Sequence, residues 1–390
     1  MALSCGAKRL FCEVDDEDQE VYSAFVAYIE AVKHAKAACV LNQTICEAVI
    51  SAYVKHRGGL QECRVFQLPD LKFNSASICE KFFIQHFRFS HAEMDRVVVS
   101  LIDIGFPLVV KTKTRDKCPL YEAVCMMCYK YAWPTRLGSM TRIFGASTSR
   151  MSRIVSALRR LLFHHFAASL KSPQLLSLAT LETYCRAVRA KSGLSICFAF
   201  IDGTVRPVCK PSILQGSCYN GKDRVHALKY QAVTTPDGMF LQLAGPWPGA
   251  RHDQHMVKQS GILDYVVNLP RRPDGALFVI YADQGYATAP GIETPYFDDA
   301  VNAQHAAYNE AMSASRVTVE WAFGGILQNW AHNNFTPTQQ LLSNRKIGQV
   351  YLVAGLLTNL LNCLKPNNTS VYFGVPPPVL EVYVRSMFKA

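Results

Sequence analysis

The spacing of apolar residues changes near residue 195, and this change limits the folds open to the chain. Before it, apolar residues recur every three or four positions, as in 79–105 and 120–133, which predicts helices. After it, short apolar runs alternate with turn residues, which predicts strands. Helical spacing returns after about residue 308. We therefore expect an all-helical N-terminal part followed by an α/β part, without the internal repeats of a solenoid.

Four apolar runs in the second part predict the strands of a sheet. They are residues 195–201, 228–234, 239–245 and 277–282. The second and third runs flank Pro236-Asp237-Gly238, which predicts a hairpin because glycine tolerates the positive φ of a tight turn.

The composition is that of a folded protein with one basic segment. Of the 390 residues, 49% are hydrophobic and 18% are charged, which excludes a disordered chain. The formal net charge is +11, and residues 111–160 alone hold eleven Lys or Arg against two acids. Such a segment indicates a polyanionic partner, with nucleic acid the first candidate. A solvated helix face would explain part of the same cluster.

Cysteine use and hydropathy favour an intracellular protein. The 14 cysteines are scattered, and no apolar segment near the N-terminus follows the pattern of a signal peptide, so we expect reduced, buried thiols. Cys125 and Cys128 form a lone CxxC in a helix-like run, which predicts core thiols rather than zinc ligands. The longest apolar stretch, 350–364, is too short to span a bilayer, so no membrane association is expected.

A helix-turn-helix is predicted within the basic segment. Residues 136–144 form a short helical stretch that ends at a glycine, and Ser147 can cap a second helix. Ser149, Arg150 and Arg153 lie off the apolar face of that helix, near its N-terminus, where a recognition helix contacts DNA. A plain helical bundle has the same spacing and remains the alternative.

Three carboxylates have distinctive positions in the α/β part. Asp202 directly follows the first predicted strand, Asp283 directly follows the last, and Glu320 lies on the helical segment 316–324. Acids at neighbouring strand ends and on a packed helix can converge on one or two Mg²⁺ ions, which prefer oxygen ligands. Two such ions, about 3.5–4 Å apart, activate an attacking oxygen and stabilise a leaving one in phosphoryl transfer.

Each of these acids also has a simpler explanation. Asp202 precedes a glycine and can close a turn, and Asp283 can cap one. Glu320 can form an ion pair with Arg316, four residues earlier on the same helix. The hypothesis of a metal site therefore depends on the three acids together.

Four segments carry a resemblance to a known family. They are Phe-Ile-Asp-Gly-Thr at 200–204, Trp-Pro-Gly-Ala-Arg-His-Asp at 247–253, Ala-Asp-Gln-Gly-Tyr at 282–286, and residues 316–324. In this order they resemble the successive motifs of the PIF/Harbinger-type DDE transposases, a family that includes domesticated Harbinger-derived nucleases. The similarity covers about residues 120–380.

The resemblance implies a fold, a chemistry and partners. The fold is α/β, an RNase H-like mixed sheet flanked by helices, after an all-α region with the helix-turn-helix. Asp202, Asp283 and Glu320, separated by 81 and 37 positions, form the metal-binding DDE triad, with two Mg²⁺ or Mn²⁺ ions. The chemistry is cleavage of DNA by metal-activated water, followed by joining of the freed 3′-hydroxyl to target DNA. A Myb/SANT-like DNA-binding partner, a homo-oligomer on DNA and a nuclear location are also implied.

Three details qualify the resemblance. Residues 219–226 match a segment expected to contact the DNA backbone. Asp253 belongs to a His-Asp pair of the family, although it could simply cap a helix that begins there. After the glutamate many relatives carry a basic stretch, whereas residues 324–330 here carry no charge, which removes phosphate contacts.

The predicted organisation has four parts. They are a helical region of unknown role (1–85), a helical region with the helix-turn-helix (86–170), the catalytic domain (171–346), and a C-terminal helix and tail (347–390). The alternative function is a domesticated, non-catalytic DNA or chromatin adaptor, which the neutral segment favours and the intact triad does not. A weaker alternative is an RNase H-like exonuclease or ribonuclease.

Overall fold

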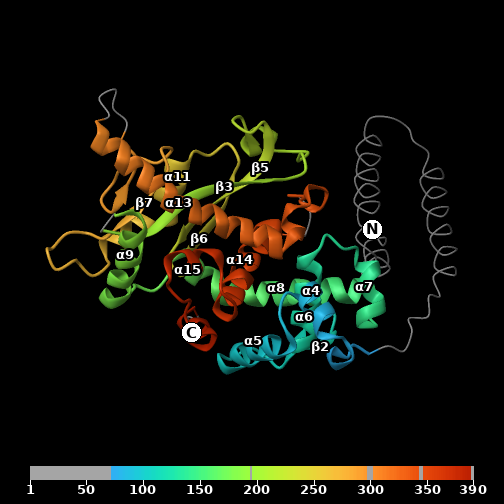
Figure 1. Cartoon of the computed structure of the whole chain (residues 1–390). Helices are drawn as coiled ribbons and strands as arrows, with labels where there is room; N and C mark the ends of the chain where they lie inside the picture. The colour runs from blue at the N-terminus through green and yellow to red at the C-terminus, as the bar shows by residue number, and fades with distance from the viewer. Residues whose placement is uncertain (1–71, 194–195, 297–301, 342–345, 388–390) are drawn as a thin grey trace, which may run out of the picture. The chain divides into compact units, whose positions relative to one another are not determined.

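The computed structural model describes residues 72–193, 196–296, 302–341 and 346–387 (Figure 1). Backbone contacts divide the chain into two compact units: residues 1–73 with 136–153, and residues 74–135 with 154–390. Most of the predicted N-terminal region, residues 1–71, therefore lies outside the described residues. The four-part organisation stays a prediction.

In the first unit, the described residues contain the predicted pair of helices. Helix α7 (Leu137–Phe144) ends at Gly145, whose φ of 57° is left-handed and suits a residue without a Cβ. Helix α8 (Thr148–Lys171) follows, and the Oγ atom of Ser147 accepts a hydrogen bond from the backbone N–H of Arg150. The predicted cap is thus confirmed. The bounds of α8 extend past residue 153 into the second unit.

The second unit begins with helices and a small hairpin. Its first elements are α4 (Glu80–Phe87), α5 (His91–Asp103), β1 (Val109–Lys111), β2 (Lys117–Pro119), α6 (Leu120–Ala132) and α9 (Leu178–Ser192). Helix α6 is almost wholly buried, and neither Cys125 nor Cys128 has any exposed surface. Burial raises the pKa of both thiols, so the prediction of core thiols is confirmed.

A mixed sheet of six strands forms the centre of the α/β part. Its strands are β3 (Cys197–Pro207), β4 (Tyr219–Asn220), β5 (Val225–Thr234), β6 (Phe240–Pro248), β7 (Val279–Tyr281) and β8 (Ile292–Glu293). Strands β6, β5 and β3 are antiparallel neighbours, and β7 and β8 continue the sheet parallel to β3. Strand β4 pairs with the start of β5. The predicted hairpin is confirmed, because Gly238 has a φ of 80° between β5 and β6.

The predicted strand boundaries differ from the structure at several ends; β7, for example, ends at Tyr281, so Asp283 does not follow it directly. The largest difference is at the end of the first strand. Strand β3 does not end at Ile201 but continues to Pro207, and Asp202 lies opposite Ala232 of β5 in the middle of the antiparallel ladder. Asp202 therefore does not close a turn. The extra residues remain in the strand because β5 offers them paired backbone groups as far as Ala227.

Different helices cover the two faces of the sheet (Figure 1). One face packs against α13 (Ala303–Asn329), α14 (Ile347–Leu364) and α15 (Asn368–Phe373); for example, the ring of Tyr230 on β5 lies 4.1 Å from that of Tyr351. The next residue of β5, Gln231, donates a hydrogen bond at 3.0 Å to Ser260 of α11 (Asp253–Ser260). Because neighbouring strand residues point to opposite faces, α11 covers the other face.

The remaining elements are short. They are α10 (Gln215–Cys218), α12 (Ile262–Val267), α16 (Leu380–Met387) and 3₁₀ turns at Ser75–Ser77, Ala331–Asn334 and Thr336–Thr338. Among the described helices, α14 is long and apolar enough to cross a membrane, but 72% of it is buried within the fold. Packing against β6 and α13 identifies it as a core helix.

Candidate active site

The strand register brings the two aspartates together. Strands β3 and β7 run parallel with Phe200 beside Tyr281, and Asp202 and Asp283 each follow those partners by two positions. The register therefore places both aspartates at the same end of this strand pair, with Asp202 still within β3 and Asp283 two residues beyond the end of β7. Each uses one oxygen in the same way: its Oδ1 accepts a hydrogen bond of 2.7 Å from the backbone N–H of the next residue.

Arg316 of α13 connects the third acid to this pair. Its Nη1 atom lies 2.9 Å from Oδ2 of Asp202, and its Nη2 atom lies 3.1 Å from Oε1 of Glu320. The predicted ion pair between Arg316 and Glu320 is thus confirmed, but it is only half of the arrangement. The same guanidinium also binds an acid 114 positions away in the sequence.

The site carries more negative charge than Arg316 neutralises. Burial raises the pKa of Asp202 to about 6, although Arg316 acts to lower it, and both Asp283 and Glu320 raise it further. Desolvation outweighs the ion pair because the carboxylate of Asp202 is only 19% exposed. Glu320, at 53% exposure, faces solvent on the open side of the site. A carboxylate pKa raised in this way indicates a place where an additional cation would be stabilised.

The donors fit a hard divalent cation. All three acids supply carboxylate oxygens, the ligands that Mg²⁺ and Mn²⁺ prefer. The guanidinium of Arg316 already places a positive charge between Asp202 and Glu320, where it forms an ion pair with each. Within the described residues, no three His, Cys, Asp or Glu side chains form a ready ligand set, so Arg316 would have to release these oxygens to a metal ion.

Sequence reasoning missed two residues beside the acids. Lys229 of β5 donates to Oδ1 of Asp253 at 3.2 Å, so that Asp253 reaches across to the sheet. Tyr286, three residues after Asp283, is 5% exposed, and its pKa is raised by burial and then by the charges of Asp253, Asp202 and Asp283. Only the third of the four motif segments, in which Tyr286 follows the second aspartate, gave a signal for either residue.

The predicted DNA-contacting residues lie in the first unit. Ser149, Arg150 and Arg153 are half-buried in the first two turns of α8, and each makes contacts of its own. The basic segment is not one solvated face, because Arg159 is only 7% exposed, and burial lowers its pKa. The acids lie in the second unit, so the two groups of residues are described separately.

Two residues of the uncharged stretch after Glu320 are anchored in the core, whereas Gln328 is exposed. Ile326 and Trp330 have no exposed surface, and the indole N–H of Trp330 donates to the hydroxyl of Thr358 on α14 at 3.1 Å. Arg88 donates to the carbonyl of Asn329 at the end of α13. Tertiary packing therefore constrains this stretch on the side of Ile326 and Trp330.

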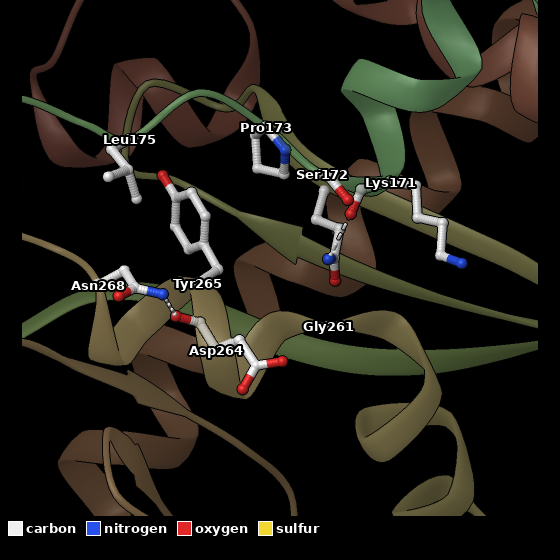
Figure 2. Close-up of a pocket in the computed structure, with 9 residues that line it drawn as sticks. Lys171, Ser172, Pro173, Leu175, Gly261, Asp264, Tyr265 and Asn268 are labelled. Atoms are coloured by element: carbon white, nitrogen blue, oxygen red, sulfur yellow. Dashed lines mark hydrogen bonds between the residues drawn. The ribbon is translucent and has the colours of Figure 1, made fainter.

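A pocket elsewhere in the second unit has no comparable chemistry. It lies between the end of α8, α12 and β6, with Tyr265 and Leu175 toward one side and Lys171 and Ser172 toward the other (Figure 2). None of its lining residues belongs to the acidic cluster. Its single acid, Asp264, has no second carboxylate beside it in the lining, so the acidic cluster is the better candidate for chemistry.

An aspartate within β3, an aspartate just after β7 and a glutamate on α13 define an acidic site of the kind used in metal-dependent phosphoryl transfer. Residues 201–359, which contain all three acids, match the family described as DDE superfamily endonuclease. The chain is also similar to "Protein ALP1-like" of Arabidopsis thaliana, with 21% identity over 299 residues, 72% of this chain and 70% of that protein. No solved structure matches. Residues 201–359 therefore match a DDE superfamily endonuclease domain, and the domain resembles the Harbinger type.

Proposed function

We propose that the chain is a metal-dependent DNA endonuclease of the transposase type, with Asp202, Asp283 and Glu320 as its catalytic triad. The observation that carries the proposal is the pair of ion pairs by which Arg316 joins Asp202 to Glu320. The register of β3 and β7 supports it, because Asp283 follows β7 at the end of the sheet where Asp202 lies. The central position of β3 in a mixed sheet also supports the RNase H-like fold that the resemblance implies.

The roles of the residues follow from their positions. Asp202 and Asp283, each oriented by a hydrogen bond from the backbone N–H of the next residue, would hold two Mg²⁺ or Mn²⁺ ions. Glu320 would complete the site and orient the attacking water. The ions, when bound, supply a nucleophilic water and stabilise the leaving oxygen. Arg316, released from the carboxylates, would be positioned to contact a phosphate, for which a guanidinium is well suited.

The substrate side of the proposal extends beyond the triad. DNA is the substrate class, and Ser149, Arg150 and Arg153 at the start of α8 are proposed to contact it. The joining of 3′-hydroxyl ends to target DNA, a Myb/SANT-like partner, assembly of several copies on DNA and a nuclear location belong to the same proposal. The similarity to the DDE endonucleases supports the choice of DNA.

A cleavage assay tests this function. Supercoiled plasmid is incubated with the full-length protein and Mg²⁺ or Mn²⁺, and the same assay is run with Asp202→Ala. We expect nicking by the wild type, its loss in EDTA, and a rate at least about 100-fold lower in the variant, since metal-bound water supplies the nucleophile. A variant that nicks DNA as fast as the wild type would contradict the proposal. A parallel assay on RNA–DNA hybrids separates it from the ribonuclease alternative.

One observation favours a second candidate, a non-catalytic DNA or chromatin adaptor. The chain has no charged residue from 324 to 330, after Glu320, which leaves fewer phosphate contacts beside the acids. An adaptor would bind DNA without binding divalent ions at the triad. Isothermal titration with Mn²⁺ distinguishes the two candidates, because only the endonuclease requires binding.

A further inference from the structure

Two glycines close to the catalytic aspartates leave room for the carboxylate of a fourth acid, Asp253. Gly203 follows Asp202 directly, and Gly285 follows Asp283 by two positions. A Cβ atom placed on Gly203 would lie 3.4 Å from Oδ1 of Asp253, and a Cβ atom on Gly285 would lie 3.2 Å from its Oδ2. Neither glycine has a positive φ, so these positions are constrained by space rather than by backbone conformation. Asp253 therefore lies against both segments that carry the catalytic aspartates.

Asp253 approaches from the face of the sheet opposite to Arg316. Along β3, Asp202 points toward α13, so the next residue, Gly203, points toward α11. A Cβ atom on Gly203 would indeed meet Met256 of α11 at 3.1 Å. This geometry makes Asp253 a support behind the two aspartates rather than a fourth ligand beside them.

A lysine fixes the carboxylate of Asp253 in this position. Lys229 and Asp253 are 14% and 35% exposed and form an ion pair of 3.2 Å between β5 and α11. Helix α11 begins at Asp253, with His252 as its N-cap and no side-chain hydrogen bond at that cap. The alternative that Asp253 merely caps the helix is therefore not supported, because its carboxylate is bound to the sheet.

A buried hydroxyl points into the same space. The Tyr286 oxygen would lie 3.5 Å from a Cβ atom on Gly203, and it has no hydrogen-bond partner in the described part of the chain. A buried donor without an acceptor is costly, so a bound oxygen is expected between the two segments. After burial, the negative charges of Asp253, Asp202 and Asp283 also raise the pKa of this hydroxyl.

We propose that Asp253 is a positioning residue, which, fixed by Lys229, sets the separation of the segments carrying Asp202 and Asp283. This proposal rests on the proposed metal site, because it explains how that site is kept in shape. Residues that orient metal ligands without touching the metal typically contribute about 10–100-fold to its affinity. Gly203 and Gly285 are small so that Asp253 can contact both segments.

A double-mutant cycle between Gly285→Ala and Asp253→Ala tests the proposal. Apart from the adjacent residues of the chain, Asp253 is the one described residue that a Cβ on Gly285 would meet within 4 Å, so the first substitution acts through that carboxylate. The Mn²⁺ dissociation constant of the full-length protein is measured by isothermal titration. We expect each single variant to bind at least about tenfold more weakly, and the double variant no more weakly than Asp253→Ala alone.

Two further variants separate position from charge. Asp253→Asn keeps the size and one acceptor oxygen, so it should recover most of the affinity that Asp253→Ala loses. Asp264→Asn on α12 removes the same charge away from the site and should bind Mn²⁺ like the wild type. If Asp253→Ala does not fold, Lys229→Met replaces it, because it releases the same carboxylate.

The outcomes distinguish this proposal from the proposed function. Wild-type Mn²⁺ affinity in Asp253→Ala, or additive losses in the double variant, would overturn the positioning role. A wild type that binds no Mn²⁺ contradicts the proposed function instead. In that case, the same double-mutant cycle is measured by urea unfolding in EDTA instead of by Mn²⁺ binding. Non-additive shifts of the unfolding midpoint support the contact between Asp253 and the segment of Gly285, and additive shifts overturn it.

Discussion

Arg316 neutralises part of the acidic site, and replacing it gives a sharp test of the electrostatics. In Arg316→Met, Asp202 loses an ion pair of 2.9 Å in which both side chains are less than one-fifth exposed. Removal of one partner from a buried pair costs about 3–5 kcal/mol. Because Glu320 is 53% exposed and can be hydrated, we expect the lower end of this range, about 3 kcal/mol at pH 7.5.

The loss should depend on pH in a defined direction. The pKa of Asp202 in the folded protein, about 6, lies above its ordinary value of 3.8, so ionised Asp202 reduces stability above pH 6. This penalty disappears as the pH falls from 6 toward 3.8. Without Arg316 the folded pKa rises further, so the variant suffers more at pH 7.5 than the wild type does. At pH 5 Asp202 is mostly protonated in both proteins, and we expect a difference of about 1 kcal/mol or less.

Urea unfolding followed by circular dichroism in EDTA, at pH 7.5 and pH 5, measures both differences. Arg186→Met is the matched control, since Arg186 on α9 is exposed and its replacement removes the same charge. The control should lose little stability, and equally at both pH values. An Arg316→Met loss that is the same at pH 5 as at pH 7.5 would refute the coupling between Arg316 and Asp202.

Three other predictions test separate parts of the account. Arg316→Met should bind Mn²⁺ about tenfold more tightly by isothermal titration, because the guanidinium no longer competes for two carboxylates; weaker binding would contradict that competition. Arg150→Ala and Arg153→Ala should each reduce the salt slope of DNA binding by about 1, as measured by fluorescence anisotropy; unchanged slopes would exclude phosphate contacts there. Tyr184→Phe should lower the free energy of unfolding, measured in urea, by about 1–3 kcal/mol. The variant loses the hydroxyl that donates at 2.7 Å to the buried carboxylate of Asp237, and an unchanged unfolding midpoint would count against that hydrogen bond.

Local features of the fold were predictable from the sequence. The hairpin at Gly238 and the cap at Ser147 were predicted because turn and cap chemistry is decided within a few residues. The burial of the CxxC thiols followed from the apolar spacing around them. The change from helices to a mixed sheet was likewise visible in the periodicity.

The parts that depend on distant pairing were not predictable. The end of β3 was misplaced because its second half is stabilised by β5, and nothing in Asp202-Gly203 itself indicates a strand. The ion pair between Arg316 and Glu320 was considered because it is local, whereas the contact of Arg316 with Asp202 joins a helix to a strand 114 positions away. Asp253 was missed as a support because its neighbours come from three elements that meet only in the fold.

Mn²⁺ binding tests the central claim, that Asp202, Asp283 and Glu320 form one divalent-metal site, most directly. Isothermal titration is performed on the wild type and on Asp202→Asn, Asp283→Asn and Glu320→Gln, with circular dichroism to confirm folding. The account predicts that the wild type binds Mn²⁺ and that every one of the three variants binds at least about tenfold more weakly, because each removes a carboxylate ligand. Equal affinity in all four proteins, or no binding by the wild type, would contradict it.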